Sequence, residues 1–310
     1  MHKVFIDGKE GTTGLKLAER LKRRDDIEIL EIPEEFRKDT AARKDYLNNC
    51  DIAFLCLPDE AAKEAVALVE NPRVKIIDAS TAHRTKETWA YGFPELGYEF
   101  RKKIEEGYRI AVPGCHASGF LSIVCPLVAL GVLSTDYPVV CHSVTGYTGG
   151  GKKMIAEYEG ENRSLALDSP RQYALGQSHK HLNEMTVISG LEYQPVFNPI
   201  VASFPQGMAV TVPLYTRLLN NVKTNEDVFS ALKSHYDGQK LVTVERFDGK
   251  FLAANMLAGK NSMKIIVGGN DERINITAVF DNLGKGASGA AVQCMNIATG
   301  TEETKGLTEE

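Results

Sequence analysis

The sequence predicts an α/β fold: a Rossmann-like, doubly wound parallel sheet domain followed by a mixed α+β domain. Three observations support this prediction. Short apolar strands alternate with helical patterns through the first third of the chain, a glycine-rich turn follows the first strand, and longer β-rich segments begin after residue 139. Strands that alternate with helices form parallel βαβ units, whereas strands joined by hairpins form antiparallel sheets.

The first domain should open with a strand at residues 3–7 and a helix at residues 14–24. This helix is amphipathic, and basic residues gather near its end, where the helix dipole favours positive charge. Its apolar residues are Leu15, Leu17, Ala18 and Leu21, and its basic ones are Lys22, Arg23 and Arg24. Further strands are expected at 28–32, 52–57 and 75–79, with a helix at 60–70, as in a doubly wound sheet.

The second half is richer in strands. The turn sequence Gly268-Gly269-Asn270-Asp271 predicts a hairpin between its last two strands. Strands are expected at 139–145, 200–214, 241–247, 263–267 and 273–280, with helices near 225–236 and 286–299. The polar tail at 301–310 is expected to fray.

Composition indicates a soluble protein whose partner is a small molecule. The chain has 310 residues, 43% of them hydrophobic, which suffices for a sizeable core and suggests two domains. A net charge of −5 provides no basic field for nucleic acid or an anionic membrane. Because no signal-peptide core or membrane-spanning apolar run occurs, the cytoplasm is the expected location. The six cysteines lack CxxC spacing, so neither a disulfide framework nor a metal site is expected.

The segment YRIAVPGCHASGFL predicts a reactive thiol. A short apolar strand runs into Pro113-Gly114, and Cys115 then stands at the start of a helix. The unpaired N–H groups and the dipole at a helix N-terminus favour the thiolate, which is the nucleophilic form of cysteine. This context outweighs the alternative that Cys115 is a buried, inert cysteine.

The first strand ends in DGKEGTTG, which places Gly8, Gly11 and Gly14 before the first helix. Glycines in such a turn allow a pyrophosphate to approach the helix N-terminus, so the motif indicates dinucleotide binding; a merely tight turn is the alternative. The residues expected to select between NAD and NADP give conflicting indications. Glu31 suits a ribose, as in NAD, whereas Arg37 and Lys38 suit the 2′-phosphate of NADP, and each could also be a solvated loop charge.

A second glycine-rich segment, GYTGGGKK, follows the strand expected at 139–145. It matches a P-loop except that Lys153 stands where a serine or threonine should bind Mg²⁺. The favoured interpretation is therefore a loop that binds an anionic substrate. A nucleotide-binding P-loop and a solvated turn remain as alternatives.

Two further segments carry candidate polar residues. His179 and His181 lie two residues apart, and general acid/base catalysis is favoured over a structural or metal-binding role. DASTAHRT follows the strand expected at 75–79, so Ser80 and Arg84 should lie where ligands gather in doubly wound folds. Arg84 could bind a carboxylate or phosphate, or form a surface ion pair.

Taken together, these motifs resemble the N-acetyl-γ-glutamyl-phosphate reductases, specifically their shorter (type 2) form. PGC and DNLGKGASG also resemble the related aspartate-semialdehyde dehydrogenases, whereas HKHLNEM, GFPEL and FPQGM are typical of the glutamyl-phosphate branch. In the long form a tyrosine usually follows the cysteine, where this chain has His116, and the first glycine motif is spaced differently. The matching motifs span nearly the whole chain: DGKEGTTG, DASTAHRT, GFPEL, PGCHASG, SVTGYTGGGKK, HKHLNEM, FPQGM and AVFDNLGKGASGAAVQCMN.

The resemblance implies a glyceraldehyde-3-phosphate dehydrogenase-like fold and an NADP-dependent reductase of arginine biosynthesis. The Rossmann domain would comprise residues 1–114 and 286–310, and the catalytic and oligomerisation domain residues 115–285. Cys115 would attack the acyl phosphate as a thiolate and release phosphate. Hydride from NADPH would then reduce the thioester to an aldehyde.

The same resemblance implies roles for individual residues. His181, or else His179, would activate the thiol and transfer protons, and Arg84, Lys152 and Gly150 would hold the substrate. A homo-oligomer, dimer or tetramer, is expected. The implied NADP(H)-binding residues are Gly8, Gly11, Thr12, Thr13, Gly14, Ser80, Arg37 and Asn282, the last through its amide.

Three rival functions remain open at this point. Aspartate-semialdehyde dehydrogenase would use the same chemistry on a smaller substrate. An acyl-phosphate reductase could instead act on a substrate presented by a carrier protein. A P-loop nucleotide-binding module belongs to a different class and would depend on Lys152 rather than Cys115.

Overall fold

The computed structural model describes residues 1–308, and the chain forms two compact units. The first unit comprises Met1–Pro94, Tyr98–Pro113 and Ala287–Leu307. The second comprises Glu95–Gly97, Gly114–Gly286 and Thr308. The chain therefore enters the second unit briefly at residues 95–97 before it enters for the long central stretch.

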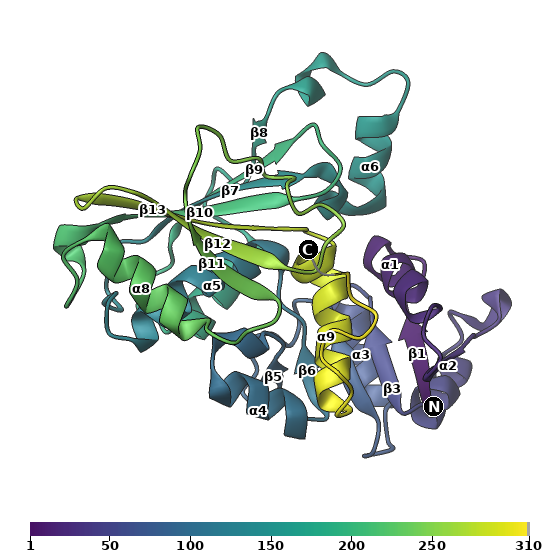
Figure 1. Ribbon diagram of the computed structural model, residues 1–310. Helices are drawn as coiled ribbons and strands as arrows, with labels where there is room; N and C mark the ends of the chain where they lie inside the picture. The colour runs from purple at the N-terminus through teal and green to yellow at the C-terminus, as the bar shows by residue number, and fades with distance from the viewer. Residues whose placement is uncertain (309–310) are drawn as a thin grey trace. The chain divides into compact units, whose positions relative to one another are not determined.

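The first unit is built on a six-stranded, wholly parallel sheet in the order β2-β1-β3-β4-β6-β5 (Figure 1). The order reverses at β1, and such a switch point is where doubly wound folds bind their ligands, beyond the carboxyl ends of the strands. The strands are β1 (His2–Asp7), β2 (Ile27–Leu30), β3 (Ile52–Leu55), β4 (Lys75–Asp78), β5 (Ala90–Tyr91) and β6 (Arg109–Ala111).

Helices cover both faces of this sheet, as the alternation of its side chains requires. Val4 and Ile6 of β1 belong to the core beneath α1, α4 and α9, whereas Phe5, between them, belongs to the core beneath α2 and α3. The helices are α1 (Thr12–Leu21), α2 (Thr40–Asn49), α3 (Asp59–Leu68), α4 (Tyr98–Glu106) and α9 (Gly289–Ala298). The predicted Rossmann-like domain is thus confirmed.

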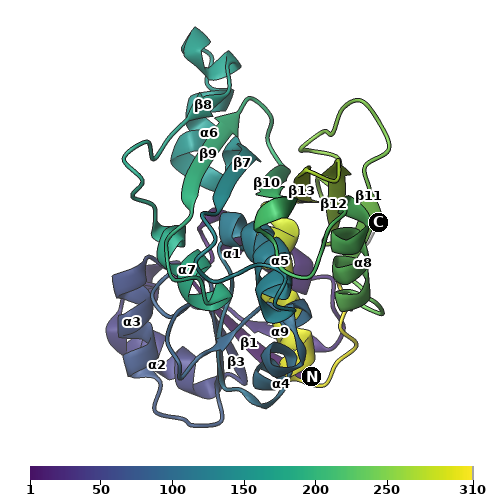
Figure 2. The same ribbon diagram turned by 90° about the vertical axis from the view of Figure 1, so that its left-hand side faces the viewer.

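The second unit contains a seven-stranded mixed sheet in the order β11-β12-β13-β10-β7-β9-β8. Helices α5 and α8 pack on this sheet and α7 packs against α5, while Figure 2 shows α6 beside β7 and β9. The strands are β7 (Val140–Gly146), β8 (Arg171–Gln172), β9 (Val196–Ala202), β10 (Met208–Tyr215), β11 (Val242–Arg246), β12 (Met263–Gly269) and β13 (Arg273–Phe280). The helices are α5 (Cys115–Ala129), α6 (Gly151–Glu159), α7 (Lys180–Ser189) and α8 (Asn225–His235).

Two expectations about the chain after residue 199 are wrong. The single strand expected at 200–214 is two strands, β9 and β10, which both pair with β7 but in opposite directions. The turn between them contains Pro205, which lacks an N–H, and Gly207, whose φ of +113° L side chains rarely adopt. The tail does not fray at its start, because the Asn296 side chain donates to the carbonyls of Glu303 and Lys305, each at 2.9 Å. Residues 309–310 lie outside the described part.

Candidate active site

Cys115 is the first residue of α5, directly after the turn that follows β6. Gly114 is the N-cap residue and provides no side chain, so the first N–H groups of α5 have no side-chain cap. Cys115 is partly exposed. Burial raises the pKa of the Cys50 thiol to about 12, and burial together with the carboxylates of Asp78 and Asp7 does the same for Cys56. These two thiols are therefore protonated near neutral pH.

The turn before Cys115 is held by the helix that carries the histidines. The backbone N–H of Gly114 donates a hydrogen bond to Oε1 of Glu184 at 2.8 Å. Glu184 lies in α7, one turn after His181, and both side chains are buried. Gly114 and Glu184 are 70 residues apart in the sequence, so this hydrogen bond brings the PGC and HKHLNEM motifs together.

His179 and His181 occupy different positions at the start of α7. His179 is the N-cap residue, and its Nδ1 accepts a hydrogen bond from the backbone N–H of His181 at 3.1 Å. Because that lone pair is occupied, neutral His179 carries its proton on Nε2 and acts as a donor there. Burial, and then the charge of Lys180, lowers the pKa of His179 to about 4.

His116 packs against both of these histidines, with ring centroids 5.6 Å from His179 and 5.5 Å from His181. Its Nδ1 lies 2.6 Å from Oγ of Ser143, and its Nε2 lies 2.8 Å from the hydroxyl of Tyr173. Burial, followed by the charges of His179 and Lys180, lowers the pKa of His116 to about 3. His116 is thus a neutral imidazole with both nitrogens engaged, and it joins Cys115 to the histidine pair.

Sequence reasoning missed the roles of Tyr173 and Ser143 in this cluster. Burial raises the pKa of Tyr173, and the negative charge of a Cys115 thiolate raises it further, so the phenol lies within electrostatic reach of the thiol. Tyr173 is 57 residues from His116 and follows the two-residue strand β8, so no local pattern marks it. The position of His116 directly after Cys115 was the only sequence feature that pointed to this cluster.

The glycine-rich loop after β7 does not have the geometry of a P-loop. Its first three backbone N–H groups donate to carbonyls of the loop before β10 and so do not point at a common phosphate position. The bonds run from Gly146 to Gly207, from Tyr147 to Phe204 and from Thr148 to Pro205, at 3.0, 3.0 and 3.2 Å. Gly150 is the N-cap of α6, and Lys152 is exposed in the first turn of that helix.

Asn282 joins the same two loops through its side-chain amide. Its Oδ1 accepts from the backbone N–H of Gly207 at 2.9 Å, and its Nδ2 donates to Oγ1 of Thr148 at 3.1 Å. Asn282 itself is 1% exposed. The structure thus places the predicted residues Asn282 and Gly150 on one loop cluster of the second unit.

The turn after β1 in the first unit is packed so closely against neighbouring backbone that it requires glycine at two positions. Gly8 has a φ of +83°, and a Cβ there would collide with the carbonyl of Cys56. A Cβ on Gly14 would lie 2.6 Å from the carbonyl oxygen of Gly8. Gly11 is the N-cap of α1, and the helix begins at Thr12 and Thr13 without a side-chain cap. The sequence-predicted glycines therefore form one continuous cradle at a helix N-terminus.

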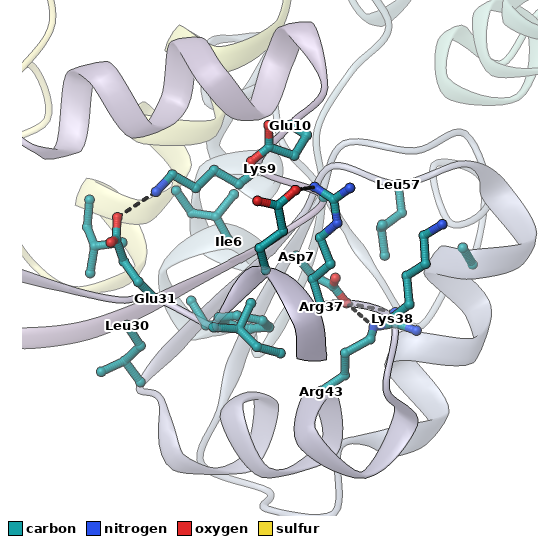
Figure 3. A pocket seen from close by; sticks show the side chains of 16 residues that line it. Ile6, Asp7, Lys9, Glu10, Leu30, Glu31, Arg37, Lys38, Arg43 and Leu57 are labelled. Carbon is teal, nitrogen blue, oxygen red and sulfur yellow. Dashed lines mark hydrogen bonds and ion pairs between the residues drawn. The ribbon is translucent and has the colours of Figure 1, made fainter.

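A cavity of about 610 Å³ opens beside this turn, between the ends of β1 and β2 (Figure 3). Glu31 lines it, but its carboxylate is bound by the Lys9 ammonium at 2.5 Å, which lowers the pKa of Glu31. Asp7 is held by Arg43 at 2.8 Å. Arg37 and Lys38, both exposed, also line the cavity, and Nη1 of Arg37 lies 3.6 Å from Oε1 of Glu34.

Ser80 and Arg84 follow β4 and are both buried. The Ser80 hydroxyl donates to Oδ2 of Asp78 at 2.6 Å. Arg84 donates through Nε to the carbonyl of Val112 at 2.9 Å and through Nη2 to that of Ala79 at 3.1 Å. Arg84 thus holds the backbone just ahead of the Pro113-Gly114-Cys115 turn, and it is not the exposed arginine of a surface ion pair.

Within residues 1–308, no group of three or more histidine, cysteine, aspartate or glutamate residues could hold a metal ion. The same residues include no helix that is both long and apolar enough to cross a membrane.

Comparison with known proteins identifies the family. Residues 3–105 match the NAD binding domain of semialdehyde dehydrogenases, and residues 115–282 match the dimerisation domain of the same enzymes. The fold resembles aspartate semialdehyde dehydrogenase II from Vibrio cholerae, with a TM-score of 0.71 at 19% identity, covering 96% of this chain and 98% of that one. A Candida albicans aspartate semialdehyde dehydrogenase with NADP gives a TM-score of 0.67 at 13% identity and similar coverage, 96% and 98%.

Sequence relatives are considerably closer. The N-acetyl-gamma-glutamyl-phosphate reductase of Sinorhizobium fredii is 47% identical over 95% of this chain and 98% of its own length. N-acetyl-gamma-glutamyl-phosphate reductase 2 of a Nostoc species is 45% identical over 98% and 99%. The expected resemblance is confirmed: the chain belongs to the semialdehyde dehydrogenase family and, within it, to the N-acetyl-γ-glutamyl-phosphate reductases.

Proposed function

We propose that this protein reduces N-acetyl-γ-glutamyl phosphate to N-acetylglutamate 5-semialdehyde and phosphate, a reaction of arginine biosynthesis, with NADPH as reductant and a thioester on Cys115. The thiolate forms a bond to the acyl carbon, and the C–O bond to phosphate breaks. When bound, the cofactor supplies the hydride that reduces the thioester carbon. The tetrahedral product then releases the aldehyde and restores the thiolate.

The observation that best supports this proposal is the placement of Cys115 at the uncapped N-terminus of α5. Backbone N–H groups at that position stabilise negative charge on the sulfur, and they can also stabilise the oxyanion that forms when the carbonyl is attacked. Cys115 is partly exposed, as a nucleophile must be, whereas Cys50, Cys125, Cys141 and Cys294 are buried.

His181 is proposed as the general acid and base. His179 uses its Nδ1 lone pair to cap α7, so it cannot accept a proton there without losing that hydrogen bond. A neutral His179 can instead donate from Nε2, as an oxyanion donor would. His116 remains neutral, because its pKa is about 3, and therefore adds no positive charge beside His181.

Arg84, Lys152 and Gly150 are proposed to bind the anionic groups of the substrate. Lys152 is exposed in the first turn of α6, where both its ammonium and the helix N-terminus favour an anion. Gly150 precedes it as N-cap and leaves the backbone accessible. Arg84 supplies a fixed guanidinium whose position is set by two backbone carbonyls.

The cradle around Gly8 fits the pyrophosphate of a nicotinamide dinucleotide, because glycine permits the tight turn before α1 and the first N–H groups of α1 have no side-chain cap. Gly11, Thr12, Thr13 and Gly14 would hold this pyrophosphate. We propose NADP(H) rather than NAD(H). Lys9 neutralises Glu31, the acid that would otherwise hold a ribose hydroxyl, while Arg37 offers a guanidinium for a 2′-phosphate.

Ser80 and Asn282 are proposed to contact the nicotinamide end of the cofactor. In the structure the Ser80 hydroxyl is bonded to Asp78, and the Asn282 amide is bonded to Gly207 and Thr148. These bonds fix the orientation of both side chains. The remaining lone pairs on their oxygen atoms are the groups that could accept from a carboxamide.

The protein is proposed to assemble as a dimer or tetramer through the face of the mixed sheet that faces away from α5. On this face, Ile200, Val144 and Ala209 lie side by side on three adjacent strands, and all three are partly exposed. An apolar row on an exposed sheet face needs a cover. The match to a dimerisation domain supports the choice of a second copy as that cover.

The proposed reaction can be tested in its reverse direction. Purified protein should reduce NADP⁺ in the presence of phosphate and N-acetylglutamate 5-semialdehyde, with absorbance at 340 nm as the readout. Cys115→Ser should abolish turnover, because an alcohol is not ionised near neutral pH, whereas Cys56→Ser should retain it. Turnover with aspartate semialdehyde alone would overturn the substrate assignment. Turnover of only a carrier-bound acyl group would overturn it as well.

A further inference from the structure

Glu95 and Lys285 form an ion pair inside the second unit that the proposed chemistry does not use. Lys285 Nζ lies 2.6 Å from Oε1 of Glu95, and the two side chains are 3% and 0% exposed. Removing two charges from water is unfavourable, and their mutual attraction does little more than offset that desolvation cost. Such a pair contributes little net stability but holds two backbone segments in a defined relation.

Near Glu95 the chain leaves the first unit for only three residues, and Glu95 is one of them. Residues 95–97 belong to the second unit, although Pro94 before them and Tyr98 after them belong to the first. The short excursion falls in the GFPEL motif. It also delivers the carbonyl of Glu95 to Nε2 of His235, at 3.2 Å, at the end of α8. Glu95 is thereby fixed to the second unit through both its side chain and its backbone.

Lys285 belongs to the turn that lies against the proposed nucleophile. This turn, Gly284–Ser288, is π-helical, a geometry that occurs frequently at functional sites. Gly286, the residue after Lys285, lies so close to Cys115 that a Cβ on Gly286 would be 3.0 Å from the Cβ of Cys115. The N–H of Gly284, the first residue of the turn, donates to Oδ1 of Asp281 at 2.9 Å. The turn is thus held at its start by Asp281 and at Lys285 by Glu95.

We propose that the Glu95–Lys285 ion pair is a positioning device for Cys115, which presses the Gly286 backbone against the nucleophile and fixes where the thiol lies. This inference rests on the proposed function of Cys115. The pair has no net charge, so it constrains geometry without adding a full charge beside a thiolate. A displacement of the nucleophile by about 1 Å is enough to reduce a rate on the order of a hundredfold.

The test replaces both partners with side chains of similar size but no charge. Glu95→Met combined with Lys285→Met should fold, because buried ion pairs are commonly replaced by apolar residues without loss of stability. We expect kcat to fall by about ten- to a hundredfold while KM for the acyl phosphate stays within about twofold, since positioning affects the chemical step. Circular dichroism and thermal melting establish that the assayed protein is folded.

Two further variants separate the ion pair from other effects. Lys285→Arg keeps the pair and should retain kcat within about threefold. Arg101→Met with Glu303→Gln is the matched control, because it removes a partly buried ion pair, 3.0 Å long, that lies wholly within the first unit. This control should leave kcat unchanged, whatever it does to the melting temperature.

Each outcome has a defined meaning. A double-methionine variant that is folded and has the wild-type kcat would overturn the positioning proposal and leave the proposed function intact. An equal loss of kcat in Lys285→Arg would also overturn it, because the pair would still be present. Failure of the wild-type protein to reduce the acyl phosphate, or turnover by Cys115→Ser, would instead refute the proposed function.

Discussion

Glu184 accepts a hydrogen bond from the backbone N–H of Gly114 at 2.8 Å, so the helix of the two histidines is tied to the residue before Cys115. Gly114 and Glu184 are both buried, and a buried N–H without an acceptor costs about 1–3 kcal/mol. The bond therefore determines how the cysteine and the histidines face one another.

Replacing Glu184 tests this bond. Glu184→Gln retains an oxygen acceptor and should keep most of the activity, whereas Glu184→Met removes it. We expect the methionine variant to lose about 1–3 kcal/mol of stability and at least tenfold in kcat. Urea unfolding and steady-state kinetics measure the two effects. Equal kcat values for the glutamine and methionine variants would contradict the role of the hydrogen bond.

The two histidines should differ in their effect on the reaction. Asparagine is a good N-cap residue, so His179→Asn should preserve α7 and lower kcat by about tenfold or less. His181→Asn removes the proposed acid and base, and kcat should fall by about a hundredfold or more, with loss of one limb of the pH–rate profile. A larger loss in His179→Asn than in His181→Asn would reverse the assignment.

His116 should make the folded protein sensitive to acid. Its pKa is about 3 in the folded state, against about 6.5 when unfolded, so the folded state binds fewer protons between these values. This contribution to stability is complete above pH 6.5 and is lost as pH falls towards 3. Between pH 7 and pH 5, His116 should account for a loss of about 2 kcal/mol.

Urea unfolding at pH 7 and pH 5 measures that loss. His116→Gln cannot titrate and should therefore lose about 2 kcal/mol less than the wild-type protein over this interval. The remaining acid sensitivity should include His179, whose pKa is lowered to about 4. Identical pH dependence in the two proteins would show that His116 is not buried as a neutral group.

Cofactor preference should depend on Arg37. Arg37→Ala removes the guanidinium proposed to bind the 2′-phosphate, so KM for NADPH should rise about tenfold while KM for NADH stays nearly constant. Arg73→Ala is a suitable control, because Arg73 is exposed just before β4, at the opposite end of the strands. A parallel rise for NADPH and NADH would refute recognition of the phosphate by Arg37.

Oligomerisation should depend on the apolar row of the mixed sheet. Val144→Asp places a carboxylate between Ile200 and Ala209, and burying that charge against a second copy would cost several kcal/mol. Sedimentation velocity should show a smaller species for this variant than for the wild-type protein. An unchanged sedimentation coefficient in a folded Val144→Asp variant would place the interface elsewhere.

Elements with strong local patterns could be predicted from the sequence. The apolar run of Val4, Phe5 and Ile6 marks β1, and the glycines around Gly8 mark the turn, because each signal is contained in a few neighbouring residues. The prediction of one strand at 200–214 was wrong, because the segment is apolar on both sides of Gly207 and the chain reverses direction there. Pro205 within that run was a sign of a break.

The sequence by itself determined the parallel fold of the first unit, the glycine cradle and the position of Cys115 at a helix start, because helix and strand periodicity and turn chemistry act over a few residues. Only the tertiary structure decided what surrounds the thiol. His116 meets Tyr173 from 57 residues away, and Glu95 meets Lys285 from 190 residues away. Such contacts depend on how whole elements pack, and the periodicity of one segment carries no information about its distant partner.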